Sequence, residues 1–176
     1  MKERISMLDE KLVELLNDQV NKEFYSAYLY LSMANYYNEE GLSGFGNWFT
    51  IQAQEERDHA MLFLEYLQNN GAHVELKTVE APKKKFKEFK DPLDESLKHE
   101  RYVTASIHNI YAAASKVKDF RTMQFLDWFV KEQGEEEKTA EDLIKKLELF
   151  GQDGKGLYML DSELAARTYS APTLTL

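Results

Sequence analysis

The chain has 176 residues, of which 43% are apolar, 12% aromatic and 30% charged, and its formal net charge at pH 7 is −9. This length accommodates one domain with a sizeable core, and the apolar content excludes a disordered chain. The sequence has no cysteine, which excludes disulfides, iron–sulfur clusters and thiol nucleophiles, and its negative charge disfavours nucleic acid as a partner.

Neither a signal peptide nor a membrane-spanning segment is expected. The first five residues lack an apolar run, and no stretch approaches the roughly 20 apolar residues that cross a membrane. We therefore expect a cytoplasmic protein. The basic run that begins at Lys83 is interrupted by acids, and we interpret it as a solvated connector.

Apolar residues at helical spacing predict four long helices and a short fifth one. The predicted ranges, in chain order, are 8–39, 43–70, 92–118, 120–150 and 156–167. Gly41 ends the first helix, Ser43 is expected to cap the second, and Asp119 is expected to cap the fourth. Asp91 is expected to cap the third, with Pro92 at its first helical position. The fold class is therefore all-α, with residues 1–176 expected to form one domain.

The connections predict how the helices are arranged. Short turns join helices one and two, and likewise three and four, so each pair should form an antiparallel hairpin. About 20 residues separate the pairs, which at about 3.3 Å per residue covers the height of a helix about 45 Å long. We expect a four-helix bundle in which this crossover spans the full height and places the second hairpin parallel to the first.

Polar side chains fall within the apolar stripe of each long helix. At about 100° per residue, Glu23 shares the inner face with Val20 and Ala27. The polar residues on the inner faces of the other three helices are Glu56, His59, Glu100, Gln133 and Glu136. Each helix therefore directs at least one acid or amide into the core at roughly mid-length.

Each of these residues alone has a simpler explanation, because a single Glu at a stripe edge is often exposed and a single buried His often makes a structural hydrogen bond. Four buried carboxylates are different, since each isolated buried charge costs on the order of several kcal/mol. No Lys or Arg lies on these faces, which leaves shared protons or bound cations. Two divalent ions would balance the four charges, and carboxylates with one imidazole favour iron or manganese.

Six segments of the sequence carry a specific pattern, and they are Leu16–Glu23, Tyr25–Tyr30, Gln54–His59, Lys98–Glu100, Phe125–Glu137 and Gly156–Leu164. Together they resemble the bacterial and archaeal non-haem ferritins over almost the whole chain. The same helix bundle, with Glu and Glu-x-x-His ligands, is typical of ferritin-like proteins. The resemblance implies iron as the metal and a homo-oligomeric shell of 24 subunits that stores ferric mineral.

The resemblance also implies a ferroxidase centre with two irons in each subunit. The implied ligands are Glu23, Glu56 and His59 for the first iron, and Glu56, Glu100 and Glu136 for the second. The residues implied beside the centre are Gln133 and Tyr30. The implied ligands of a third, neighbouring iron are Glu55, Glu132, Glu135 and Glu136. Glu55, Glu132 and Glu135 lie off the inner stripe, so a solvated helix face is the alternative for them.

The sequence departs from three related families. Bacterioferritins carry a haem-binding Met where this chain has Arg57, and a second Glu-x-x-His where it has Gln133-x-x-Glu136, so no haem is expected. Rubrerythrins add a cysteine iron site that this chain lacks. Animal ferritins place acids at a threefold pore, and the matching positions here are Leu126 and Met123. That entry route for iron is therefore in question.

Our leading hypothesis is that paired Fe(II) ions are oxidised by O2 or peroxide and that the ferric product moves into a store. One alternative is a di-metal oxidase or oxygenase that retains its irons and acts on an organic substrate. Another is a helical interaction module whose core acids are protonated. The number of irons taken up per subunit separates these possibilities.

Overall fold

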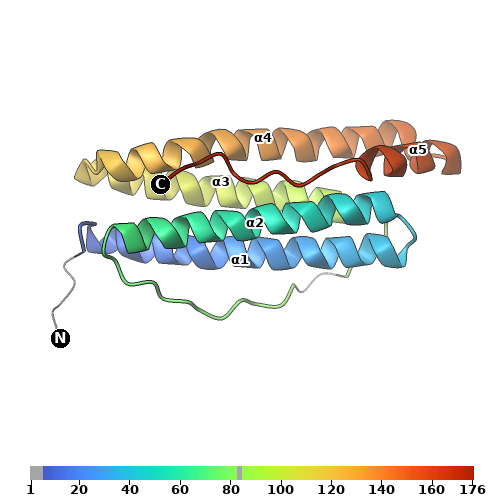
Figure 1. The fold of residues 1–176 in the computed structure, drawn as a ribbon. Coiled ribbons are helices and arrows are strands. Elements are labelled where there is room, and N and C mark those ends of the chain that lie inside the picture. Colours follow the sequence, from blue (N-terminus) through green and yellow to red (C-terminus); the bar gives the residue numbers. More distant parts are fainter. Residues whose placement is uncertain (1–5, 83–84) are drawn as a thin grey trace.

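The computed structural model describes residues 6–82 and 85–176, which form five helices and no strand (Figure 1). The helices are α1 (Glu10–Glu39), α2 (Ser43–Asn69), α3 (Asp91–Val117), α4 (Phe120–Phe150) and α5 (Gly154–Leu164). The prediction of an all-α bundle of four long helices with a short fifth helix is confirmed. Residues 1–5 and Lys83–Lys84 lie outside the described residues, and so do the expectations about a signal peptide and about the start of the basic run.

Aspartates begin three of the helices. The side chain of Asp9 accepts a hydrogen bond from the backbone N–H of Lys11 at 2.9 Å, and the predicted cap Asp119 accepts one from Thr122 at 3.0 Å. Asp153 accepts one from Gly156 at 2.8 Å, which places the start of α5 before the predicted residue 156. These bonds satisfy N–H groups that have no partner within the helix.

Two predicted caps and one predicted helix end are wrong. Ser43 begins α2 as predicted but is not its cap, because the capping position is taken by Leu42, whose side chain makes no capping bond. Asp91 is likewise the first residue of α3, and Lys90 takes the capping position. α5 ends at Leu164 and the next two residues form a turn, so Arg167, which we placed in the fifth helix, lies in the C-terminal segment that follows α5.

The crossover between α2 and α3 runs the length of the bundle beside α1, as Figure 1 shows. It returns the chain to the end where α1 finishes, and there the Tyr37 hydroxyl donates to the Phe89 carbonyl at 2.6 Å. α3 therefore runs parallel to α2, and the two hairpins turn at opposite ends of the bundle. The expected parallel placement of the hairpins is wrong for this reason, although the crossover itself is confirmed.

The core consists of two apolar clusters separated by a polar layer. The first cluster holds Leu16, Val20 and Phe63, and the second holds Tyr37 and Phe49, among other side chains. We call the layer between them the polar belt, and its buried members are Glu23, Glu56, His59, Glu100 and Gln133. The belt crosses all four long helices at mid-height, where the sequence periodicity placed the inner acids.

Among the described residues, none of the helices combines the length and apolarity that a membrane crossing requires.

Candidate metal centre

The polar belt collects its side chains from both hairpins. Glu23 comes from α1, Glu56 and His59 from α2, and Glu100 from α3, and the exposed fraction of each is 2% or less. On α4 the Gln133 side chain is also buried, and Glu136 lies one turn further along. Side chains three residues apart lie on one face of a helix. Glu56 and His59 on α2, and Gln133 and Glu136 on α4, therefore point to the same side of their helices.

The carboxylates and the imidazole form two adjoining groups that could each hold a metal ion. Glu23, Glu56 and His59 bring one ligand atom each to within 4.8 Å of one another, and Glu56, Glu100 and Glu136 do the same. Glu56 belongs to both groups. A carboxylate has two oxygens, so Glu56 could supply a ligand atom to each group. The structure thus brings the predicted inner residues together.

Glutamine amides hold the acids in place. Gln19 donates to Glu23 at 2.7 Å, and Gln133 donates to Glu100 at 3.0 Å. Gln52 donates to both Glu56 at 3.0 Å and Glu136 at 2.9 Å, which joins the two hairpins. The Oε2 atoms of Glu23 and Glu136 are buried and have no hydrogen-bond partner among the described residues, which is the arrangement that a cation ligand needs.

Sequence reasoning missed Gln19 and Gln52. The signal was present, because each stands four residues before an inner Glu and therefore one turn away on the same helix face. It also missed the buried His99, whose Nε2 lies 2.7 Å from the Ser26 hydroxyl beside the centre. The predicted Tyr30 is buried and donates a hydrogen bond to Glu100.

Burial and mutual repulsion change the acidities of these groups. Burial, with the neighbouring charge of Glu56, raises the pKa of Glu23 to about 8, and burial raises the pKa of Glu100 to about 7. Burial and the charges of Glu56 and Glu100 raise the pKa of Glu136 well above its usual value. The metal-free belt therefore holds protons near neutral pH, and a metal ion must displace them to bind.

His59 and Glu56 behave as an ion pair. Burial lowers the pKa of His59, but the hydrogen bond and charge of Glu56 outweigh it and raise the pKa to about 9. The His59 Nδ1 lies 3.5 Å from the Glu56 Oε2, and although burial opposes it, this contact lowers the pKa of Glu56. In the metal-free protein, the positive charge of the His59 imidazolium lies beside Glu56, where the charge of a bound metal ion would lie.

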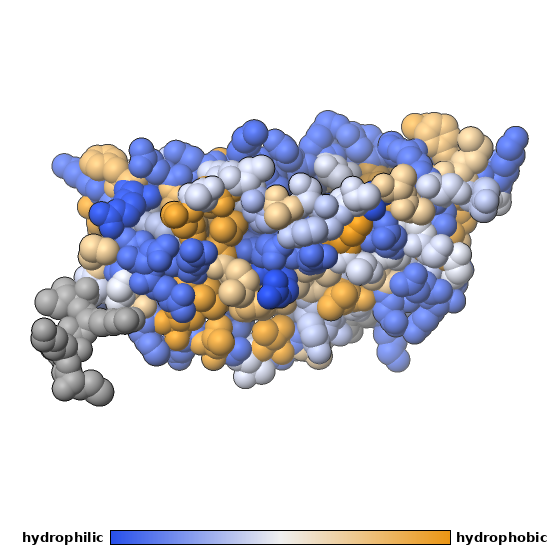
Figure 2. Space-filling model, viewed as in Figure 1, coloured by the Kyte–Doolittle hydropathy of each residue, from blue (hydrophilic) through white to orange (hydrophobic). Residues whose placement is uncertain are grey.

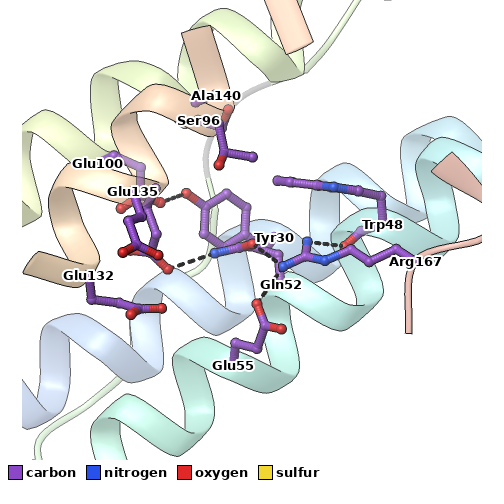
Figure 3. Close-up of a pocket in the computed structure, with 12 residues that line it drawn as sticks. Tyr30, Trp48, Gln52, Glu55, Ser96, Glu100, Glu132, Glu135, Ala140 and Arg167 are labelled. Carbon is purple, nitrogen blue, oxygen red and sulfur yellow. Dashed lines mark hydrogen bonds and ion pairs between the residues drawn. The ribbon is translucent and has the colours of Figure 1, made fainter. Parts of the chain in front are cut away.

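The residues expected around a third iron do not all belong to one candidate ligand group. Glu132 and Glu136 form a third candidate group with His59 within 4.8 Å. Glu55, however, is bound by Arg167 at 2.5 Å, and Glu135 lies 3.4 Å from Lys131 on the surface. Glu55, Glu132 and Glu135 all line a cavity of about 140 Å³ beside the belt, shown in Figure 3.

Comparison with known proteins agrees with this geometry. The ferritin-like domain family matches residues 13–150 of the chain. The chain belongs to the ferritin family. It is 41% identical to the bacterial non-heme ferritin of Staphylococcus aureus (strain USA300) over 93% of this chain and 98% of that protein. The corresponding protein of Staphylococcus haemolyticus is 40% identical over the same shares.

Solved ferritins have the same fold. An open pore ferritin from the hyperthermophilic archaeon Archaeoglobus fulgidus superposes with a TM-score of 0.89 at 45% identity, covering 92% of this chain and 98% of that one. An engineered closed form of the Archaeoglobus fulgidus ferritin gives a TM-score of 0.90 at 44% identity, covering 93% and 99%. Membership of the ferritin family makes the chain an iron-storage subunit, as the sequence indicated.

Two further positions concern the entry route that the sequence put in question. Leu126 is fully buried in the first apolar cluster, and Met123 packs against that cluster. Both side chains therefore contribute to the bundle core, and neither carries a charge that could attract iron to a pore.

Proposed function

We propose that this subunit oxidises Fe(II) at the polar belt and passes Fe(III) to a mineral store enclosed by a homo-oligomeric shell of 24 subunits in the cytoplasm. The observation that supports this proposal most strongly is the pair of adjoining ligand groups that share Glu56. Two Fe(II) ions bound there carry +4, which compensates the four carboxylates of Glu23, Glu56, Glu100 and Glu136.

The reaction needs two electrons from two neighbouring irons. Two Fe(II) ions become two Fe(III) ions, and their electrons with two protons convert O2 to H2O2, or convert H2O2 to two molecules of water. The belt residues fix the separation of the two ions, exclude most of the solvent, and provide anionic oxygens that favour the higher charge of Fe(III). Carboxyl protons released on metal binding are available to the reduced oxidant.

The same ligands suit iron in transit. The group of Glu56, Glu100 and Glu136 contains only oxygen ligands, and it borders the 140 Å³ cavity that carries three further acids. A ferric ion can therefore leave the belt through a region lined by carboxylates. We assign the third iron to this cavity, with Glu132 and Glu136 as ligands and with Glu55 and Glu135 at its rim.

The alternative of an oxidase or oxygenase with an organic substrate is less well supported. A cavity of 140 Å³ holds a few water molecules, at about 30 Å³ each, whereas pockets for organic ligands measure roughly 300–1,000 Å³. Its described lining includes five glutamates, and such a lining attracts cations in preference to apolar substrates.

Exposed apolar side chains support assembly of the subunit. Tyr28 and Leu31 on α1 are 55% and 47% exposed, and Tyr158 and Met159 on α5 are 72% and 62% exposed. Figure 2 shows apolar side chains intermixed with hydrophilic ones on one face of the monomer. Contacts between subunits would remove such apolar surface from water. Sedimentation of the purified protein tests the shell, since a single species near 24 times the 20.5 kDa subunit mass is expected.

Substitution of the shared ligands tests the centre. We expect Glu56→Ala and His59→Ala to lower the initial rate of Fe(II) oxidation by at least about tenfold, because each removes a ligand of the first ion. Glu65→Ala is the matched control, since Glu65 is an exposed glutamate on the same helix. Full initial oxidation by both ligand variants would refute the assignment. Uptake of no more than two irons per subunit by the wild type would refute storage.

A further inference from the structure

The C-terminal segment after α5 folds back over the bundle between α2 and α4, as Figure 1 shows. Three contacts anchor it along its length. The Asn47 side chain donates to the Arg167 carbonyl at 3.1 Å, the Tyr169 hydroxyl donates to Asp58 at 2.5 Å, and Trp128 Nε1 donates to the Thr173 hydroxyl at 3.2 Å. The segment therefore has a defined path beside the metal centre.

This path delivers the guanidinium of Arg167 to the mouth of the cavity, where Figure 3 shows it facing Trp48, Gln52 and Glu55. One nitrogen donates to the Trp48 carbonyl at 3.2 Å, and the other donates to Gln52 Oε1 at 3.0 Å and to Glu55 at 2.5 Å. The guanidinium carbon also lies 4.3 Å from the centre of the Trp48 ring. Four contacts thus define one position for the charge.

The cavity that Arg167 enters is lined mainly by acids. Among the described residues that line the cavity, it is the one cation, and the acids there are Glu55, Glu100, Glu132, Glu135 and Glu136. The Oε2 of Glu136 is buried and has no hydrogen-bond partner among the described residues. The cavity therefore has the acidic lining of a cation site, and the Arg167 guanidinium provides one positive charge within it.

We propose that Arg167 is a positioning residue whose guanidinium occupies the position beside Glu55 that a third metal ion would otherwise take. A third ion therefore gains Glu55 as a ligand only by displacing the guanidinium. This inference rests on the proposed function of the centre. It assigns the C-terminal segment a role in setting how tightly the cavity holds iron. A weak third site lets iron pass through, whereas a strong one would retain it.

A second consequence follows from Gln52. Because Arg167 donates to the oxygen of the Gln52 amide, the nitrogen of that amide must face Glu56 and Glu136, to which it donates. The guanidinium thus fixes the orientation of a side chain that contacts both hairpins. Displacement of Arg167 by a metal ion frees this amide, which couples the cavity to the two ions in the belt.

The test is a titration of the metal-free assembled protein with Zn²⁺, which does not change oxidation state, followed by calorimetry. We expect Arg167→Gln to bind the third Zn²⁺ per subunit at least tenfold more tightly than the wild type. Adding Glu55→Gln to that variant should abolish the gain. Arg101→Gln is the matched control, because Arg101 forms an ion pair with Glu141 at 3.0 Å on the surface, and it should leave the third affinity unchanged.

Fluorescence of Trp48 gives an independent readout. The sequence has two tryptophans, so Trp128→Phe leaves Trp48 as the sole reporter of the guanidinium above its ring. Because this substitution also removes the hydrogen bond from Trp128 to Thr173, calorimetry first checks that the background keeps the wild-type affinity for the third Zn²⁺. In this background the emission should change as the third Zn²⁺ binds, and it should stay constant at that step when Arg167 is Gln. Arg167→Lys, which keeps the charge without the planar fork, should show an intermediate third affinity and serves if the Gln variant does not fold.

Two outcomes distinguish a failure of the role of Arg167 from a failure of the proposed metal centre. If the first two Zn²⁺ bind normally and the third affinity is unchanged or weaker in Arg167→Gln, the role of Arg167 is overturned and the proposed centre stands. If the wild type binds no Zn²⁺ that depends on His59, the proposed function itself fails, and the inference about Arg167 fails with it.

Discussion

Replacing Glu23 with Gln should stabilise the metal-free protein, and this effect should depend on pH. The pKa of Glu23 rises from 4.5 to about 8 on folding, chiefly through burial. A group whose pKa is raised in the folded state contributes stability below its unfolded pKa, and loses it as pH rises through the folded value. The wild type should therefore lose stability as the pH rises from about 4.5 to about 8. Glu23→Gln should lose less stability over the same range.

The size of the effect follows from the two pKa values. Through linkage, ionisation of Glu23 should lower the free energy of unfolding of the wild type by at most about 3 kcal/mol more at pH 7.5 than at pH 5. The unpaired and buried Oε2 of Glu23 is the structural source of this energy. The advantage of Glu23→Gln over the wild type should grow by up to this amount across the pH range.

The assay is denaturant unfolding of chelator-treated protein at both pH values, at one fixed protein concentration because assembly contributes to stability. Glu65→Gln, at an exposed position of α2, controls for loss of a negative charge. Saturating Zn²⁺ should reverse the order, since the wild type keeps a ligand that the variant has lost. The reasoning is refuted if Glu23→Gln and the control keep the same offset from the wild type at pH 5 and at pH 7.5.

Two further predictions concern Tyr30 and the glycines. Tyr30→Phe removes the hydrogen bond to Glu100, worth about 1 kcal/mol, so calorimetry should show an approximately fivefold weaker second Zn²⁺ and an unchanged first one. Gly44→Ala would put a Cβ 1.7 Å from the Asp161 carbonyl, and should lower stability by about 1–3 kcal/mol by pushing α5 from α2. Gly134→Ala meets no described atom within 4 Å and should raise stability by about 0.5–1 kcal/mol in the same melting experiment. Equal melting temperatures for the two glycine variants would contradict this account.

Helical periodicity was sufficient to predict the inner residues. Glu23, Glu56 and Glu100 lie on stripes whose phase is fixed by many apolar neighbours, so a regular helix leaves one place for each acid. The choice of iron and all three ligand sets came from the resemblance to ferritins, because spacing alone does not say which helices face each other. The roles of these residues as ligands stay a prediction that the proposed substitutions test.

The sequence could not predict the placement of Arg167. It lies beyond the last helix, in a segment whose path depends on contacts with α2 and α4, and no periodicity specifies such contacts. The sequence suggested a helix through residue 167, whereas α5 ends at Leu164 and Arg167 reaches the Trp48 ring. Ser43 was misassigned for a related reason, since several residues near a helix start can act as its cap.

The polar belt has a mechanical consequence. One ligand group, Glu56 with Glu100 and Glu136, joins the α1–α2 hairpin to the α3–α4 hairpin. Where a bundle of this length would otherwise carry a continuous apolar seam, the two hairpins meet at mid-height through acids that repel one another when ionised. If the belt binds iron as proposed, the ions would link the two hairpins at this level. A metal-free subunit would then be easier to deform there than a loaded one.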